Sequence, residues 1–126
     1  MALGRKPYVL LVEDDPDVLR MLRTLVQPIA DVETASDGLE ALEKLKTGET
    51  PDLIVTDLMM PRMDGLALSR ELKADPKLAK IPLIMLTAKD SAKDVVTGIN
   101  AGARHYVTKP FKPHDLLAKI RKALRI

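Results

Sequence analysis

The chain has 126 residues, 46% of them hydrophobic and 30% charged, which suits one globular domain with one core. It has no cysteine, so disulfide scaffolds, cysteine-based zinc sites and thiol nucleophiles are excluded, and its net charge of +2 is too small to indicate nucleic-acid binding. Because the sequence has neither a secretory signal nor an apolar run of the roughly 20 residues that span a bilayer, we expect a cytoplasmic protein without membrane association.

Short apolar runs recur along the chain, and most are followed by a segment in which apolar residues have helical spacing. The first run, Tyr8–Val12, is uninterrupted and predicts a strand buried on both faces. Pro16 suits the first position of the next helix, with Asp15 as its N-cap. In chain order, the predicted elements are strand 8–12, a helix from Pro16 to before Pro28, strand 31–35, a helix between Asp37 and Gly48, strand 53–56, a helix containing Leu68 and Leu72 that stops near Asp75, strand 83–86, helix 91–100, strand 106–108 and a helix beginning at Pro113.

Local sequence adds detail to three of the predicted helices. Asp37 is expected to cap the second helix, with Glu40 at the spacing of a capping box. The fourth helix, 91–100, is the least convincing because valine, threonine, glycine and isoleucine are poor helix formers. Apolar spacing predicts buried faces made by Leu39, Leu42 and Leu45 in the second helix, and by Leu116, Leu117, Ile120 and Leu124 in the last.

The strict alternation of strands and helices indicates an α/β domain with a parallel sheet that is covered by helices on both faces. Five strand–helix units occupy the chain, so we expect one domain over residues 1–126 with its core at about 7–124. Because the last predicted helix reaches the end of the chain, we expect no output domain in it.

Polar residues follow four of the predicted strands. Glu13 and Asp14 follow the first strand, Asp57 the third, Thr87 the fourth and Lys109 the fifth. Ligands of open parallel sheets bind beyond these carboxyl ends, and carboxylates that meet there repel each other unless a cation such as Mg²⁺ lies among them. A lysine and a hydroxyl can bind phosphate oxygens, so the group indicates phosphoryl transfer with Asp57 as nucleophile. Each residue alone suits a turn or a helix cap, and the prediction depends on their coincidence at four strand ends.

Five segments, in order and at the expected spacing, resemble the receiver domains of bacterial two-component response regulators, and the resemblance runs from Tyr8 to about Leu124. The resemblance implies a flavodoxin-like (βα)5 fold, a three-layer sandwich whose parallel five-stranded sheet has the order 2-1-3-4-5. The matching segments are Leu10–Asp15, Asp52–Asp57, Met60–Gly65, Pro82–Ala88 and Gly102–Phe111.

The resemblance assigns a metal site. Asp57 matches the phosphoacceptor and a ligand of Mg²⁺, for which Mn²⁺ is an alternative ion. Asp14 matches the direct metal ligand, and Glu13 matches the acid that holds a metal-bound water. The backbone carbonyl of Met59 would be a further protein ligand.

The resemblance also assigns phosphate-binding and switch residues. Lys109 matches the lysine that binds the phosphoryl group, and the Lys109–Pro110 peptide bond is expected to be cis. Thr87 matches the switch hydroxyl that moves toward the phosphoryl group, and Ala88 would donate its backbone N–H. Tyr106 matches the aromatic residue whose rotamer follows Thr87.

Partners also follow from the resemblance. The phosphoryl donor would be a phosphohistidine on a sensor histidine kinase or a phosphotransfer protein. Phosphorylation would remodel the face made by the fourth helix, the fifth strand and the fifth helix, which controls a downstream partner or an output domain. We expect a monomer or a phosphorylation-dependent dimer. The late basic residues suit either a solvated helix face or a docking surface for an acidic partner; they are Lys109, Lys112, Lys119, Arg121, Lys122 and Arg125.

Three other functions would each require residues that differ from those in this sequence. A Mg²⁺-dependent phosphohydrolase with an aspartyl nucleophile needs a second acid two residues after Asp57, but Met59 stands there and has no proton to give. We therefore expect only slow self-dephosphorylation and no other enzyme activity. An interaction module that is not phosphorylated usually lacks the acid pair, the central aspartate or the lysine, and all are present here. A nucleotide-binding Rossmann domain needs a glycine-rich motif after the first strand, which this sequence lacks.

Overall fold

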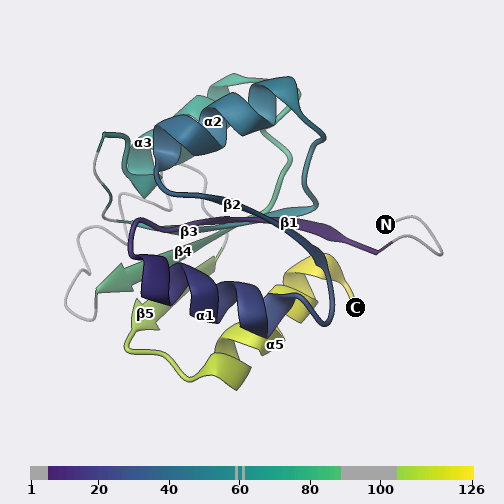
Figure 1. The fold of residues 1–126 in the computed structure, drawn as a ribbon. Coiled ribbons are helices and arrows are strands. Elements are labelled where there is room, and N and C mark those ends of the chain that lie inside the picture. The colour runs from purple at the N-terminus through teal and green to yellow at the C-terminus, as the bar shows by residue number, and fades with distance from the viewer. Residues whose placement is uncertain (1–5, 59, 61, 89–104) are drawn as a thin grey trace.

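The computed structural model describes residues 6–58, 60, 62–88 and 105–126, in which strands and helices alternate as predicted up to residue 88 and again from residue 105 (Figure 1). The predicted fourth helix, 91–100, lies outside the described residues. The elements are β1 (Tyr8–Val12), α1 (Pro16–Val26), β2 (Asp31–Ala35), α2 (Gly38–Thr47), β3 (Leu53–Asp57), α3 (Gly65–Ala74), β4 (Leu83–Ala88), β5 (His105–Lys109) and α5 (Pro113–Leu124).

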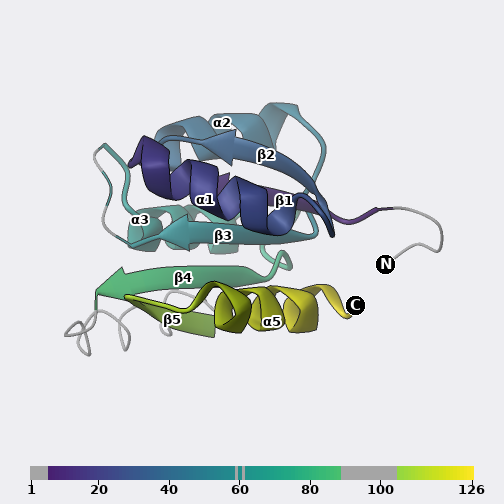
Figure 2. The same cartoon turned by 60° about the horizontal axis from the view of Figure 1, so that its bottom comes forward.

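The five strands form one sheet in the order β2-β1-β3-β4-β5, and all four pairings are parallel. This is the flavodoxin-like order predicted from the sequence. Figure 2 shows β3 and β4 pointing the same way, so their carboxyl ends lie at one edge of the sheet. Every residue that ends or directly follows a strand is therefore brought to that edge.

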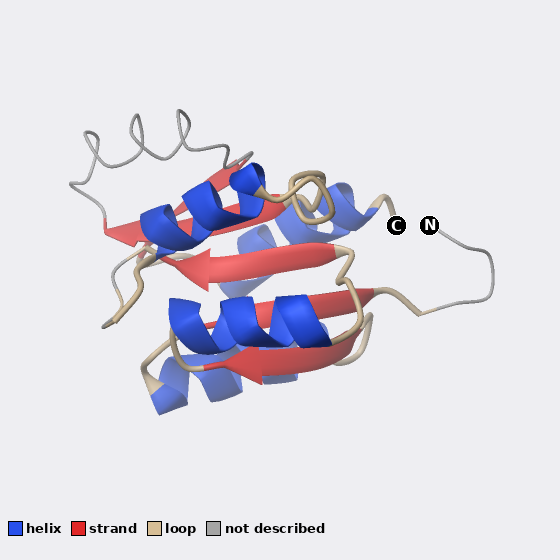
Figure 3. Ribbon diagram, turned by 90° about the horizontal axis from the view of Figure 1, so that it is seen from above, coloured by secondary structure: helices blue, strands red, loops and turns tan. Residues whose placement is uncertain are grey.

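Helices cover both faces of the sheet, with α2 and α3 on one side and α1 and α5 on the other (Figures 1 and 3). Side chains alternate along each strand, so Val9 and Leu11 of β1 join the core cluster that contains buried residues of α1 and α5. Leu10 and Val12 join the cluster that contains buried residues of α2 and α3. Burial on both faces explains why β1 is apolar throughout.

Helix α1 begins as predicted, with Pro16 in its first turn and the Asp15 carboxylate 2.9 Å from the backbone N–H of Asp17. Helix α2 departs from a capping box in one respect. Asp37 caps it by accepting the N–H of Glu40 at 2.9 Å, but the Glu40 carboxylate accepts the backbone N–H of Ser36 at 3.0 Å and its hydroxyl at 2.6 Å. The return bond thus lies one residue before the position that a capping box uses.

The predicted buried face of α2 is wrong at one position, because Leu39 is 43% exposed. The buried residues of this helix are Gly38, Ala41 and Leu45. Gly38 faces inward because its N–H donates to the carbonyl of Met63 at 3.0 Å, and a Cβ there would lie only 2.4 Å from that oxygen. This close approach turns the helix so that Leu39 faces outward.

Helix α5 has the predicted buried face: Leu116, Ile120 and Leu124 are buried, and Leu117 is half-buried. Lys112 precedes it without a side-chain cap, so Pro113 and packing define its start. In the part of the chain that the structure describes, no helix combines the length and the apolar character needed to span a bilayer.

Candidate metal and phosphate site

The register of the sheet explains why three of the predicted site residues meet. Glu13 directly follows β1, Asp57 is the last residue of β3 and Lys109 is the last residue of β5. Because side chains alternate between the faces of a strand, a residue two positions earlier lies on the same face. Those earlier residues all belong to the core cluster beside α1 and α5; they are Leu11, Val55 and Val107. Glu13, Asp57 and Lys109 therefore share one face at the carboxyl edge of the sheet.

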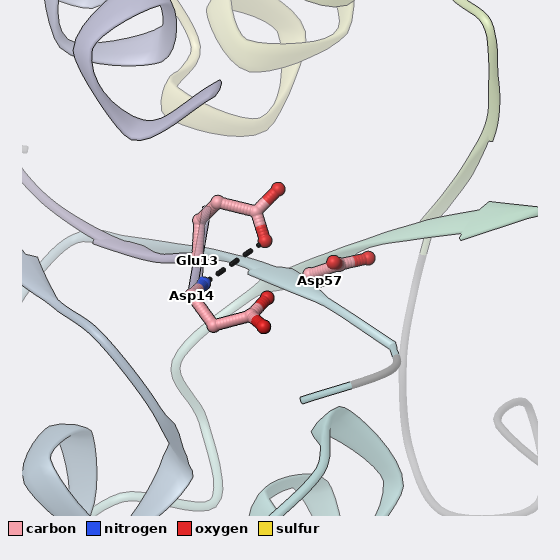
Figure 4. Close-up of side chains that lie close together, drawn as sticks. All are labelled: Glu13, Asp14 and Asp57. Atoms are coloured by element: carbon pink, nitrogen blue, oxygen red, sulfur yellow. Dashed lines mark hydrogen bonds between the residues drawn. The ribbon is translucent and has the colours of Figure 1, made fainter. Parts of the chain in front are cut away.

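Three carboxylates lie together at this edge. Glu13, Asp14 and Asp57 each offer an oxygen, and these oxygens lie within 4.8 Å of one another (Figure 4). The side chain of Glu13 is 1% exposed and that of Asp57 is 12% exposed, whereas Asp14 is exposed to solvent. The Glu13 carboxylate also accepts the backbone N–H of Asp14 at 3.1 Å. The cluster is therefore closed on the core side and open to solvent at Asp14.

The ammonium group of Lys109 pairs with two of these acids. Its Nζ lies 3.2 Å from Glu13 Oε1 and 3.1 Å from Asp57 Oδ2. Since β4 lies between β5 and β3, the side chain reaches past a whole strand to make both contacts. The Lys109–Pro110 peptide bond is cis, as predicted.

The close packing of like charges changes the protonation of the site. The pKa of Glu13 is raised to about 8, first by burial and then by the hydrogen bond and negative charge of Asp57, while Lys109 opposes the rise. Burial alone would lower the pKa of Lys109, but the hydrogen bonds and charges of Asp57 and Glu13 outweigh it and raise that pKa. Near neutral pH the site therefore favours a protonated Glu13 beside a charged Lys109.

The donor set of the cluster suits a hard divalent cation. Mg²⁺ prefers carboxylate oxygens and keeps several of its waters, and the exposed side at Asp14 leaves room for them. The raised pKa of Glu13 comes first from burial and then from Asp57, and a divalent ion among these oxygens would favour the charged carboxylates instead. Met59, whose carbonyl is a predicted ligand, lies outside the described residues.

Thr87 lies at the same edge of the sheet as the acidic cluster, and Tyr106 lies earlier on β5, where it pairs with Met85. Leu86 pairs with Asp57 in the sheet register, and Thr87 is the next residue of β4. Both Thr87 Oγ1 and the Tyr106 hydroxyl are buried, and neither has a hydrogen-bond partner among the described residues. Burial raises the pKa of Tyr106. Ala88 pairs with Lys109 in the register, which brings its backbone to the same edge.

The sequence did not predict the backbone hydrogen bonds that fix the connection between β3 and α3, which follows Asp57. The N–H of Leu58 donates to the carbonyl of Leu86 at 2.9 Å, and the N–H of Gly65 donates to the carbonyl of Leu58 at 2.9 Å. A Cβ on Gly65 would lie 2.5 Å from the Asp57 carbonyl and 2.7 Å from Met85 Sδ, so this position requires glycine. The sequence signals Gly65 only through its place in a matching segment.

A second missed feature is the ion pair between Arg62 and Asp37. The Nε of Arg62 lies 2.7 Å from Asp37 Oδ2, and Nη2 lies 2.5 Å from the same oxygen. Asp37 is explained from the sequence as a helix cap alone. No periodicity links two residues on different loops that are 25 positions apart.

Comparison with known proteins identifies the family. The sequence profile of the response regulator receiver domain matches residues 9–121. The chain belongs to the response regulator receiver domain family. Receiver domains act in phosphorelays, and this receiver is homologous to that of the alkaline phosphatase synthesis transcriptional regulatory protein PhoP of Bacillus subtilis. The two are 42% identical over 118 residues, which is 93% of this chain and 48% of PhoP. The receiver spans about half the length of the transcriptional regulators that it matches.

Solved structures agree with this assignment. The receiver matches the signal receiver domain of a signal transduction histidine kinase from Syntrophus aciditrophicus with a TM-score of 0.88 and 37% identity, covering 94% of this chain and 90% of that one. It matches the chemotaxis response regulator CheY4 of Vibrio cholerae with a TM-score of 0.88 and 31% identity, covering 95% of this chain and 100% of CheY4. The fold is thus that of known receivers over nearly the whole chain.

Proposed function

We propose that this receiver accepts a phosphoryl group on Asp57 from a phosphohistidine of a sensor histidine kinase or a phosphotransfer protein, in a reaction that depends on Mg²⁺. One observation carries the proposal: Lys109 lies within 3.2 Å of both Asp57 and the buried Glu13, and Asp14 completes a cluster of carboxylates around them. An acidic nucleophile, oxygen ligands for a cation and a fixed ammonium are the parts that phosphoryl transfer to a carboxylate needs.

The chemistry assigns a role to each of these residues. An oxygen of Asp57 attacks phosphorus, a new O–P bond forms as the N–P bond of the phosphohistidine breaks, and the departing imidazole nitrogen keeps the electron pair and takes a proton from solvent. Lys109, already 3.1 Å from Asp57 Oδ2, binds an oxygen of the arriving group. Asp14, Asp57 and the carbonyl of Met59 would hold Mg²⁺ directly, with Glu13 acting through a bound water. When bound, this ion offsets the negative charge of the carboxylates and of the phosphoryl oxygens.

The switch is proposed to pass through Thr87 and Tyr106. A phosphoryl group adds about −1.5 to −2 charge and three acceptor oxygens beside β4. The Thr87 hydroxyl, buried without a partner in the described chain, gains a bond by turning toward one of these oxygens, and the Ala88 N–H can bind another. Movement of Thr87 changes the space beside Tyr106, whose own hydroxyl lacks a partner there too. The signal would leave through β5, α5 and the predicted fourth helix, which lies outside the described residues.

The remaining predictions are part of the same proposal. We propose one receiver domain with its core at residues 7–124, no activity on other substrates beyond slow self-dephosphorylation, and no direct contact with nucleic acid or membrane. A cytoplasmic location, a monomer or phosphorylation-dependent dimer, and use of Mn²⁺ in place of Mg²⁺ stay predictions. We propose that the response is produced by a downstream partner or an output domain that this receiver controls.

The test is covalent labelling. The chain is incubated with acetyl phosphate and Mg²⁺, or with beryllofluoride as a phosphoryl analogue, and followed by intact mass spectrometry and NMR. We expect wild type and the control Asp31→Asn, which alters an exposed acid of β2, to gain one phosphoryl group, and chelation of Mg²⁺ to abolish the gain. Equal labelling of Asp57→Asn would disprove Asp57 as the acceptor, and steady turnover of phosphate esters would favour a phosphohydrolase.

A further inference from the structure

The connection between β3 and α3 is tied to the start of α2 by an ion pair. On Asp37, the carboxylate is only 7% exposed, and Arg62 lies over it with its own side chain 59% exposed. Both Nε and Nη2 of Arg62 contact the same oxygen, at 2.7 and 2.5 Å. A nearly buried carboxylate with a charged hydrogen-bond partner is a strong contact, whereas exposed pairs contribute little.

Asp37 serves two elements with its two oxygens. Oδ1 accepts the N–H of Glu40 at 2.9 Å and caps α2, while Oδ2 binds Arg62. The Glu40 N–H lowers the pKa of Asp37 more than any other group, burial opposes it, and Arg62 lowers the pKa further, so Asp37 stays ionised. A backbone bond lies beside the ion pair, from the N–H of Gly38 to the carbonyl of Met63 at 3.0 Å.

The backbone of Arg62 needs a compensating contact. Its φ is 65°, in the left-handed region, where a residue with a Cβ is disfavoured. The ion pair with Asp37 offsets that strain. Without the pair, the described residues of this connection, 58, 60 and 62–64, would be freer to leave the start of α2.

The other end of the connection is attached to Asp57 itself. Leu58 is the next residue, and its carbonyl accepts the N–H of Gly65, which packs against the Asp57 carbonyl. The connection therefore begins at the predicted phosphoacceptor and returns to it, because residues 62–65 lead from the ion pair to the Gly65 N–H that holds the Leu58 carbonyl. Asp57, the residue before Leu58, is a member of the carboxylate cluster.

We propose that Arg62 is a positioning residue for the metal and phosphate site: through its ion pair with Asp37, it holds the backbone after Asp57 in the geometry that binds Mg²⁺. Arg62 touches neither the ion nor the phosphoryl group in this scheme. The inference rests on the proposed function, because it assumes that Glu13, Asp14 and Asp57 bind Mg²⁺.

The experiment measures the Kd of Mg²⁺ on the full chain by NMR titration, without any phosphoryl donor. Arg62→Gln removes the charge, and Asp37→Asn removes it from the other side while keeping a good helix cap. Outer contacts of metal sites typically change affinity 10–100-fold, so we expect each single variant to raise the Kd roughly tenfold and the double variant to raise it no further. Arg62→Lys should restore part of the affinity.

Two further variants separate positioning from other effects. Arg20→Gln is the matched control, because Arg20 forms an exposed pair with Asp17 at 3.6 Å on α1, and its Kd should equal that of wild type. Arg62→Gly lacks the ion pair but also relieves the left-handed strain, so it should bind Mg²⁺ more weakly than wild type and more tightly than Arg62→Gln, and binding weaker than that of Arg62→Gln would contradict the role of the strain. Each Kd is measured where far-UV circular dichroism shows a folded variant, and if Arg62→Gln does not fold, Asp37→Asn gives the result.

The results distinguish a failure of the role of Arg62 from a failure of the proposed function. An unchanged Kd in Arg62→Gln or Asp37→Asn, even with a lower free energy of unfolding, means a purely structural pair and overturns the inference while leaving the proposed function intact. Strictly additive effects in the double variant also overturn it, because the two residues then act separately. Failure of wild type to bind Mg²⁺ overturns the proposed function, and the inference with it.

Discussion

Replacing Lys109 with methionine removes the only cation that the described chain places between Glu13 and Asp57. Methionine keeps most of the side-chain length and removes the charge. At pH 6, Glu13 is protonated because burial, together with Asp57, raises its pKa to about 8, so the lysine then balances chiefly Asp57. Removing one partner of a buried ion pair costs about 3–5 kcal/mol, and because the Lys109 side chain is 32% exposed we expect a smaller loss, about 2–3 kcal/mol.

The stability that Lys109→Met loses relative to wild type should be larger at high pH, and this direction follows from the raised pKa of Glu13. The folded state keeps a proton on Glu13 that the unfolded chain releases above its ordinary value of 4.5, so the free energy of unfolding falls as the pH rises from 4.5 to about 8. Lys109 lowers the pKa of Glu13, and the variant loses that effect. If the pKa of Glu13 rises by one unit in the variant, the free energy of unfolding of the variant keeps falling past pH 8. The difference in stability between Lys109→Met and wild type is then about 1 kcal/mol larger at pH 9 than at pH 6.

The assay is urea unfolding at pH 6 and pH 9 in the presence of a chelator, so that no divalent ion replaces the lysine. Lys119→Met, at an exposed position of α5, is the matched control, and its stability should stay within about 0.5 kcal/mol of wild type at both pH values. A loss in Lys109→Met that is the same at pH 6 and pH 9 would refute the coupling between Lys109 and Glu13. A loss no larger than that of the control would refute the buried ion pair.

Three further predictions use the same unfolding assay. Mg²⁺ at ten times its Kd should stabilise wild type by about 1.4 kcal/mol at pH 7 and leave Asp57→Asn unchanged, and an equal gain in both would place the ion elsewhere. Gly65→Ala gains up to about 1 kcal/mol of helix propensity, but its Cβ would lie 2.5 Å from the Asp57 carbonyl, so we expect a net loss of about 1–3 kcal/mol, and a stabilised variant would contradict this packing. Leu39→Ala should stay within about 0.5 kcal/mol of wild type while Leu45→Ala loses about 2–5 kcal/mol, and similar losses would contradict the observed orientation of α2.

The fold was predictable where local sequence and burial agree. Strand β1 has its predicted limits because an uninterrupted apolar run ends in acids, and Pro16 with Asp15 defines the next helix start. The buried face of α2 was not predictable from spacing, because it is set by the contact between Gly38 and Met63 on a distant loop. Periodicity describes one helix at a time and contains no information about such a contact.

The residues of the candidate site were predictable from the sequence, but the contacts that hold the neighbouring loops were not. The carboxyl-end rule for parallel sheets brings Glu13, Asp57 and Lys109 to one edge, and the two-residue alternation puts them on one face. The ion pair of Arg62 with Asp37 depends on how two loops approach each other. Loop conformation follows from packing of the whole domain, which the residues of one segment do not specify.

The contact between Glu13 and Lys109 joins residues 96 positions apart in the chain. During synthesis, the first strand and its glutamate emerge long before the lysine that balances them. Because the charged Asp57, which pairs with the same lysine, resists burial without it, we expect the centre of the sheet to close fully only when the edge strand β5 arrives. A nascent receiver would thus lack the proposed phosphoryl site until its last strand is in place.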